Sequence, residues 1–179
     1  MFNCHDKGVH RYMEKSSIRQ LTVMQTGTVG ETERAGADFA ESFLCCYGHA
    51  KSTIVALFGD LGVGKTAFVR GAVGRLVPGA AVQSPTYAIV KEYQNENFCV
   101  YHFDMYRIED ESSLESIDFW GYLEKGGICF IEWSENIASY LPSNYYRVTL
   151  TCEGGEQTDH ADTAVGIKRR ICIEKITSV

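Results

Sequence analysis

Residues 59–66 form a short glycine-rich segment whose residue types and spacing are those of a phosphate-binding loop. The pattern G-x-x-x-x-G-K-[ST] is matched by Gly59, Asp60, Leu61, Gly62, Val63, Gly64, Lys65 and Thr66. Glycines let the backbone fold tightly, so that successive N–H groups point at one phosphate, and a following helix adds its positive dipole end. In this pattern Lys65 reaches the β- and γ-phosphates and the Thr66 hydroxyl binds Mg²⁺. We therefore predict a nucleotide-phosphate site here.

A second anchor for Mg²⁺ is expected at the end of a neighbouring apolar strand, where P-loop proteins usually place a carboxylate. The apolar run ICFIE ends in Glu132, which meets this requirement. The other interpretation is a strand that merely ends at a solvent-facing glutamate. Trp133 follows, and it has two interpretations: a core side chain, or a ring that lies against the nucleotide.

Two further segments carry polar groups that could act at the terminal phosphate. In YHFDMYR, residues 101–107, strand alternation places His102 and Asp104 on one face. If this strand packs beside the P-loop, Asp104 faces Mg²⁺ and the γ-phosphate and orders the attacking water. His102 either braces Asp104 or serves only the hairpin. In SPTYAIV, Thr86 is a candidate contact for the γ-phosphate and Mg²⁺, although Ser-Pro-Thr is also typical of a turn entering a strand.

Strand and helix patterns alternate around these motifs and indicate one mixed α/β domain. Strands are predicted at residues 18–26, 53–58, 86–93, 98–106, 126–133, 145–153 and 164–175. The third and fourth of these form a hairpin, and the last two form another. The run at 53–58 is apolar throughout, which is typical of a parallel strand buried on both faces. Helices are predicted at residues 31–47 and 67–76, and a third opens at a capping box formed by Ser112 and Glu115.

Length and composition restrict the class of protein. The 179 residues are 45% hydrophobic and 22% charged, which is typical of a globular domain, and no apolar run is long enough to span a membrane. The net charge of −6 argues against a broad RNA-binding surface, so KRR at residues 168–170 is interpreted as a solvated strand face. Seven cysteines without a C-x-x-C pair indicate buried thiols in a reducing cytoplasm. Residues 1–17 lack a secretory-signal pattern and are expected to form a loose tail before a single P-loop ATPase domain, residues 18–179.

Five segments, in this order, resemble the TsaE (YjeE) family of small bacterial ATPases, which are required to make threonylcarbamoyladenosine in certain tRNAs. The segments are GDLGVGKT, SPTYAIV, YHFDMYRIED, LESIDFWGYL and ICFIEW, and the match runs from about Glu31 to Leu141. The combination of the P-loop with S-P-T and H-F-D-x-Y-R is specific. The resemblance implies a P-loop NTPase-like three-layer sandwich with a mixed, largely parallel central sheet and a C-terminal β-hairpin.

The resemblance also implies cofactors, roles and partners. ATP and Mg²⁺ are the implied cofactors, with Thr66 and Glu132 as Mg²⁺ ligands and Trp133 beside the nucleotide. The residues with an implied part in hydrolysis are Asp104, Lys65 and the switch-like Thr86. The implied partners are the transferase TsaD and its companion TsaB, with tRNA reached only through them and no membrane involved. ATP hydrolysis resets this complex between turnovers, while threonylcarbamoyl transfer itself belongs to TsaD.

Three positions depart from the family pattern. Asp118 stands where a glycine is usual, which alters the helix that meets the partner, and Ser134 stands where a proline is usual. The family also has a basic residue near the nucleotide in its C-terminal strand region. Here Ile167 falls close to that position and Lys168, Arg169 and Arg170 follow, so the contact is not carried over to any one of them.

Other functions fit parts of the pattern. A small-molecule kinase would use Asp104 as the base for a substrate hydroxyl, but the sequence has no arginine-rich lid segment. A GTPase switch would read residues 118–121 as D-x-x-G, but these residues follow a helix pattern, and the guanine-reading motif N-K-x-D is absent. A nucleotide-gated adaptor would bind partners with hydrolysis only incidental. The main hypothesis is the ATPase of the TsaE type.

Overall fold

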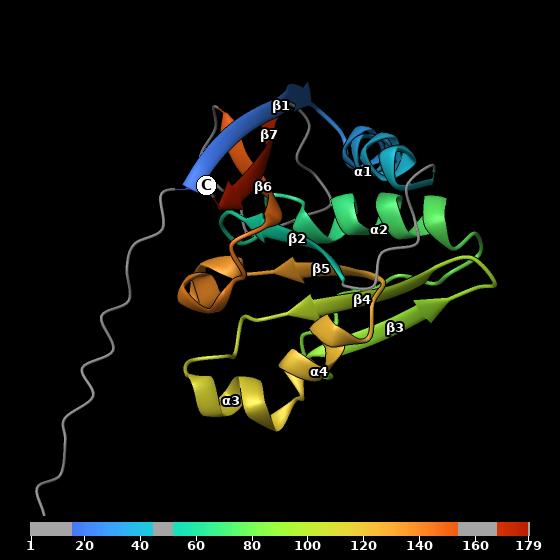
Figure 1. The fold of residues 1–179 in the computed structure, drawn as a ribbon. Helices are drawn as coiled ribbons and strands as arrows, with labels where there is room; N and C mark the ends of the chain where they lie inside the picture. Colours follow the sequence, from blue (N-terminus) through green and yellow to red (C-terminus); the bar gives the residue numbers. More distant parts are fainter. Residues whose placement is uncertain (1–15, 45–51, 154–167, 179) are drawn as a thin grey trace, which may run out of the picture.

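The computed structural model describes residues 16–44, 52–153 and 168–178, and its centre is one seven-stranded sheet (Figure 1). The strands are β1 (Ser16–Thr26), β2 (Thr53–Phe58), β3 (Val90–Gln94), β4 (Cys99–Asp104), β5 (Ile128–Glu132), β6 (Tyr145–Glu153) and β7 (Lys168–Ser178). The helices are α1 (Val29–Leu44), α2 (Lys65–Leu76), α3 (Glu111–Ser116), α4 (Phe119–Glu124) and the 3-10 helix η1 (Ser134–Tyr140). All the strands belong to this single sheet.

The sheet is parallel in its centre and antiparallel at both ends. Its spatial order is β1-β7-β6-β2-β5-β4-β3, in which β6, β2, β5 and β4 run parallel to one another. β3 pairs antiparallel with β4, and β7 pairs antiparallel with both β6 and β1. The two hairpins expected from the sequence, β3–β4 and β6–β7, are therefore confirmed.

The layers follow from the apolar side chains of the central strands, which point to both faces of the sheet. On one face, Leu57 and Phe130 pack with Phe68 in a core covered by α1 and α2. On the other face, Phe103 and Ile131 pack in a second core that α3, α4 and η1 cover. Figure 1 shows α1 beside α2, with α3 and α4 near β4 and β3. Strands that are apolar on both sides require a helix layer on each, which gives three layers.

Two boundary expectations need correction. The strand expected at residues 86–93 begins only at Val90, because residues 86–88 form a turn and Ile89 has a φ of 65°. The N-cap of α3 is not Ser112. It is Asp110, whose carboxylate accepts a hydrogen bond of 2.8 Å from the backbone N–H of Ser113. Aspartate is a strong N-cap, and the chain uses the one placed two residues earlier.

Some expectations concern residues that the structure does not describe. The expectation of a loose tail over residues 1–17 is wrong for Ser16 and Ser17, which begin β1 and pair with β7. The rest of that expectation falls on residues 1–15, which lie outside the described residues. The same holds for residues 45–47 of the first predicted helix and 164–167 of the last predicted strand. Within the described ranges, no helix is long and apolar enough to cross a lipid bilayer.

The thiol of Cys129 is buried, as the cysteine pattern predicts. Burial raises its pKa to about 12, because a thiolate would lose its hydration in the core. Burial also raises the pKa of the Cys172 thiol. Neither cysteine is in a disulfide. These two thiols therefore stay protonated at neutral pH and serve packing.

The helices α1 and α2 cross so closely that two glycines stand where no side chain fits. A Cβ on Gly71 would lie 1.7 Å from the Glu33 carbonyl oxygen, and one on Gly36 would lie 2.0 Å from the Phe68 carbonyl oxygen. We expect Gly71→Ala to lower the free energy of unfolding by about 1–3 kcal/mol, because the helices must move apart. Gly74→Ala, on the same helix but with open space around it, should instead raise it by about 1 kcal/mol through helix propensity. Denaturant unfolding measures both, and equal effects would contradict the close crossing.

Candidate nucleotide-phosphate site

The glycine-rich segment forms the loop between β2 and α2, at the carboxyl end of a buried parallel strand. Its glycines have positive φ angles of 133° at Gly59, 78° at Gly62 and 105° at Gly64, a region that other residues rarely adopt. Gly59 also faces a neighbouring strand, since a Cβ there would lie 2.2 Å from the Leu150 carbonyl oxygen. α2 begins at Lys65, so the N–H groups of its first turn are available to an anion. The loop has the backbone geometry of a phosphate cradle.

Lys65 points back onto its own loop in this structure. Its ammonium group donates hydrogen bonds to the carbonyl oxygens of Gly59 and Asp60, the second at 2.9 Å, and lies 3.7 Å from the ring centroid of Trp133. Burial lowers the pKa of Lys65, although four carboxylates around the loop oppose this shift. Because its hydrogen-bond partners are neutral carbonyls, the positive charge remains for an anionic ligand.

β5 ends beside the loop and delivers Glu132 to the first turn of α2. Thr66 Oγ1 donates to Glu132 Oε2 at 2.9 Å, and Glu132 is only 3% exposed, so it is not a solvent-facing strand end. The other oxygen, Oε1, lies 2.7 Å from His102 Nε2. Of the two interpretations of His102, the one in which it braces Asp104 is therefore wrong, because its ring contacts Glu132. The hydroxyl and the carboxylate predicted to bind Mg²⁺ are in direct contact.

Asp104 ends β4, next to β5, and three donors hold its carboxylate. Oδ2 accepts hydrogen bonds from the hydroxyls of Ser84 at 2.7 Å and Thr86 at 2.8 Å, while Oδ1 accepts one from the Tyr106 backbone at 3.1 Å. Asp104 and Glu132 are direct partners in the parallel register. The S-P-T segment, the H-F-D strand and the P-loop therefore converge at one edge of the sheet, as the sequence predicts.

One basic residue joins the site from the far end of the chain. Arg169 lies on β7 opposite Thr26 and is only 8% exposed. Its Cδ and Nε lie 3.6 Å from the position of a Cβ on Gly64, so the side chain flanks the P-loop. No acidic residue of the described ranges lies within ion-pair distance of it. The interpretation of residues 168–170 as a solvated face holds for Lys168 and Arg170 but is wrong for Arg169, because strand alternation turns the middle residue inward.

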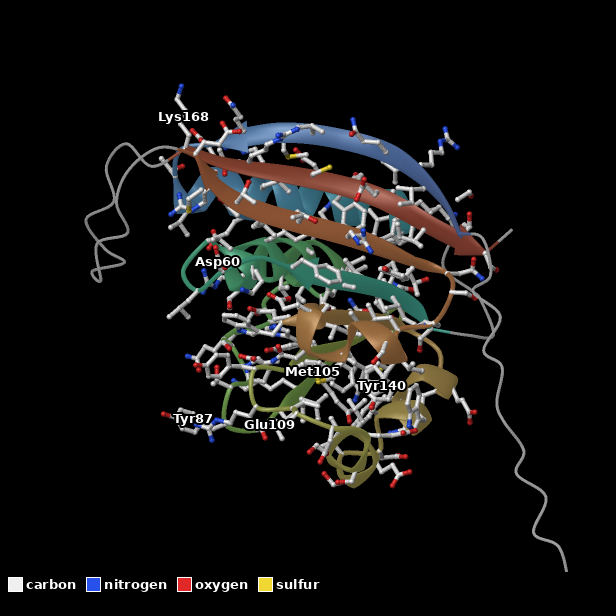
Figure 2. All side chains as sticks on the ribbon, turned by 90° about the vertical axis from the view of Figure 1, so that its left-hand side faces the viewer. Asp60, Tyr87, Met105, Glu109, Tyr140 and Lys168 are labelled. Carbon is white, nitrogen blue, oxygen red and sulfur yellow. The ribbon has the colours of Figure 1, made fainter. Side chains whose placement is uncertain are left out.

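The remaining predicted residues lie at the rim of the loop. Trp133 has a φ of 58° and its ring centroid lies 4.9 Å from that of Tyr106, while Lys65 covers the ring. Leu61, at the tip of the loop, is 77% exposed. In Figure 2, Asp60 of the loop, Tyr87 beside Thr86 and Lys168 beside Arg169 are labelled along the same side of the molecule. Trp133 therefore belongs to the site as well as to the edge of the core.

The residues present have the chemistry needed to bind Mg²⁺ and a nucleoside triphosphate. The described residues contain no group of three or more His, Cys, Asp or Glu that could hold a metal ion by themselves. Mg²⁺ does not need such a group, since it usually takes one or two carboxylates together with phosphate and water oxygens. Thr66 and Glu132 supply that kind of partial site. The positive-φ cradle, the ammonium of Lys65 and the guanidinium of Arg169, which has no acidic partner among the described residues, suit the phosphates.

Comparisons with known proteins agree with this geometry. The family model described as "Threonylcarbamoyl adenosine biosynthesis protein TsaE" matches residues 27–161. The tRNA threonylcarbamoyladenosine biosynthesis protein TsaE of Bacillus subtilis is 35% identical over 124 residues, which are 69% of this chain and 77% of that protein. The protein of the same name from Haemophilus influenzae is 41% identical over 109 residues, 61% of this chain and 68% of that protein.

A solved structure has the same fold. The crystal structure of Bacillus subtilis YdiB matches with a TM-score of 0.60 at 25% identity, over 88% of this chain and 86% of that chain. Together with the layers and the sheet order described above, this match confirms the predicted three-layer α/β fold with a mixed sheet and a C-terminal hairpin.

Proposed function

This chain belongs to the TsaE family of threonylcarbamoyl adenosine biosynthesis proteins, and from this premise we propose that it is a Mg²⁺-dependent ATPase of that pathway. The observation that carries the proposal is the convergence of Thr66, Glu132 and Asp104 beside a P-loop. P-loop enzymes use a hydroxyl and a carboxylate to hold Mg²⁺ and a further polar side chain to orient the attacking water, and these three side chains can fill those roles. Family membership supports a role of this activity in threonylcarbamoyladenosine synthesis.

Binding of ATP uses the loop and two basic side chains. The N–H groups of the cradle meet the phosphates, and Lys65 exchanges the carbonyls of Gly59 and Asp60 for the β- and γ-phosphates. Arg169, buried beside Gly64 and without an acidic partner in the described ranges, supplies a second positive charge. Thr66 and Glu132 would hold Mg²⁺, and the ion would supply neutralisation of phosphate charge and polarisation of the terminal phosphoryl group.

Asp104 is the residue that we assign to the attacking water. A buried carboxylate can accept a hydrogen bond from water and orient it for attack. The hydroxyls of Ser84 and Thr86 occupy Oδ2 of Asp104 in this structure. We propose that Thr86 transfers its hydrogen bond to the terminal phosphate when ATP binds. This exchange leaves Oδ2 of Asp104 with a free acceptor site for water, which links phosphate sensing to hydrolysis.

The proposed partners are a TsaD-like transferase and its TsaB-like companion in the cytoplasm. The net charge of −6 supports contact with tRNA only through these proteins, because direct RNA binding relies on a basic surface. In this role the chain binds the transferase complex in an ATP-dependent way, and hydrolysis resets the complex between rounds.

Reconstitution of tRNA modification from purified partners tests this function. One round of modification is expected with TsaD, TsaB, tRNA and the threonylcarbamoyl donor alone. Repeated rounds are expected only when this chain, ATP and Mg²⁺ are also present. Repeated turnover without this chain, or with a non-hydrolysable ATP analogue in place of ATP, would contradict the proposed role.

ATP binding is expected to change the fluorescence of Trp133. A cation 3.7 Å from an indole ring perturbs its emission, and Lys65 leaves this position when it moves to the phosphates. Trp120, which lies on α4 away from the loop, is removed by Trp120→Phe to give a single-tryptophan protein. The fluorescence change should persist in Trp120→Phe and vanish in Trp133→Phe. A change that follows Trp120 instead would place the nucleotide elsewhere.

A further inference from the structure

His102 is a fully buried histidine that contacts a proposed Mg²⁺ ligand. It is 0% exposed and lies on β4, between Val100 and Asp104 on the same face of the strand. Its Nε2 atom lies 2.7 Å from Oε1 of Glu132. Its other ring nitrogen, Nδ1, is buried and has no hydrogen-bond partner in the described ranges. The histidine is therefore directed at Glu132 through a single hydrogen bond.

The chemistry of the two partners fixes the direction of this bond. An ionised carboxylate can only accept a hydrogen bond, so Nε2 of His102 carries a proton and donates it. Oε1 of Glu132 is then occupied, and Oε2 is the oxygen that faces the hydroxyl of Thr66 at 2.9 Å. The two contacts hold the carboxylate from opposite oxygens.

The contact with His102 restricts a side chain that is longer than the one usual at this position. P-loop proteins commonly use an aspartate here. Glu132 has one more rotatable bond, so its carboxylate can take more orientations, and ordering it costs more conformational entropy. Its burial at 3% exposure leaves few positions for the carboxylate, and His102 selects the one in which Oε2 meets Thr66.

We infer that His102 is a positioning residue for Mg²⁺, which acts by holding the Glu132 carboxylate against Thr66. This inference rests on the proposed function, because it assumes that Glu132 and Thr66 hold the ion. Hydrogen-bond partners of ligating side chains typically change metal affinity or activity by about 10- to 100-fold when they are removed. The same range is expected for His102, without any contact between its ring and the nucleotide.

The test uses the Mg²⁺ dependence of ATP binding in the full chain, read by Trp133 fluorescence in the Trp120→Phe background. His102→Leu removes the donor, and we expect it to raise the half-saturating Mg²⁺ concentration by about 10- to 100-fold. ATP binding measured in EDTA should stay unchanged. His102→Gln keeps an amide N–H near the position of Nε2 and should restore most of the Mg²⁺ affinity, while the shorter His102→Asn should not.

Val100→Ala is the matched control, because it truncates a fully buried residue on the same strand and face without touching Glu132. If the role of His102 is purely structural, His102→Leu and Val100→Ala should both have lower thermal stability than the parent. Both should also keep the parent's half-saturating Mg²⁺ concentration. That result would overturn the inference and leave the proposed function standing. If the parent itself binds ATP without Mg²⁺ dependence, the proposed function fails instead. Should His102→Leu not fold, equal Mg²⁺ affinities in His102→Gln and His102→Asn would also overturn the inference.

Discussion

Asp104→Asn is expected to stop sustained ATP hydrolysis while ATP binding stays close to normal. The amide oxygen still accepts hydrogen bonds from the hydroxyls of Ser84 and Thr86, and only the longer bond from the Tyr106 backbone N–H loses its acceptor, so most of the local structure should persist. It cannot accept a proton from water, and loss of a positioned base typically lowers a rate by about 10²- to 10⁴-fold. Steady-state ATPase assays in the presence of the partner proteins measure the rate, and the Trp133 signal measures binding.

The same variant separates hydrolysis from partner binding. With ATP, Asp104→Asn should assemble with the transferase complex but support one round of tRNA modification and not repeated rounds. Asp38→Asn is the matched control, since it makes the same chemical change at an exposed position on α1 that belongs neither to the loop nor to the helix expected to meet the partner. If Asp104→Asn supports repeated turnover, the chain is a nucleotide-gated adaptor whose hydrolysis is incidental.

Lys65→Ala is expected to weaken ATP binding itself. A hydrogen bond to a charged group contributes about 1.5–3 kcal/mol, which corresponds to about 10- to 150-fold in affinity. The fold should survive, because burial lowers the pKa of Lys65 and the protonated side chain is therefore a net cost to the folded chain. Isothermal titration with ATP and Mg²⁺ measures the affinity, and thermal unfolding checks the fold.

Lys168→Ala provides the control for Lys65→Ala, because it removes a lysine that is exposed at the start of β7. Its ATP affinity should match that of the parent chain. A further signature is the pH dependence of ATP binding. Only the protonated ammonium binds phosphate strongly, and the pKa of Lys65 is lowered, so affinity should fall as pH rises through a pKa below that of an ordinary lysine. Normal affinity in Lys65→Ala would contradict the P-loop assignment.

The parts of the site that the sequence predicts are those encoded by short segments. The proposed phosphate cradle lies within residues 59–66, and its glycines and flanking strand and helix are local features. The shared face of His102 and Asp104 follows from the two-residue period of a strand, which the structure confirms for β4. A glutamate at the end of an apolar strand was likewise recognisable, because buried parallel strands have a distinctive composition.

Sequence patterns did not identify the correct N-cap residue of α3, where two candidates lie within a few residues of each other. Ser112 and Glu115 resemble a capping box, yet Asp110 caps α3, because its carboxylate reaches the free N–H of Ser113. At Asp118 the structure instead explains a feature that the sequence only records. Asp118 stands where the family usually has glycine, and its φ of 55° explains that preference, since glycine adopts this conformation without strain and aspartate tolerates it.

The sequence by itself determined the tight turn of the loop, the strand faces and the class of fold, because these depend on neighbours only a few residues apart. The tertiary structure alone decided which groups meet. In the folded chain His102 contacts Glu132, and the carboxylate of Asp104 accepts hydrogen bonds from the hydroxyls of Ser84 and Thr86. The tertiary structure also turned Arg169 toward Gly64 from the far end of the chain. Those contacts depend on the order of strands in the sheet, and strand order is set by packing between distant segments, which no local pattern of residues encodes.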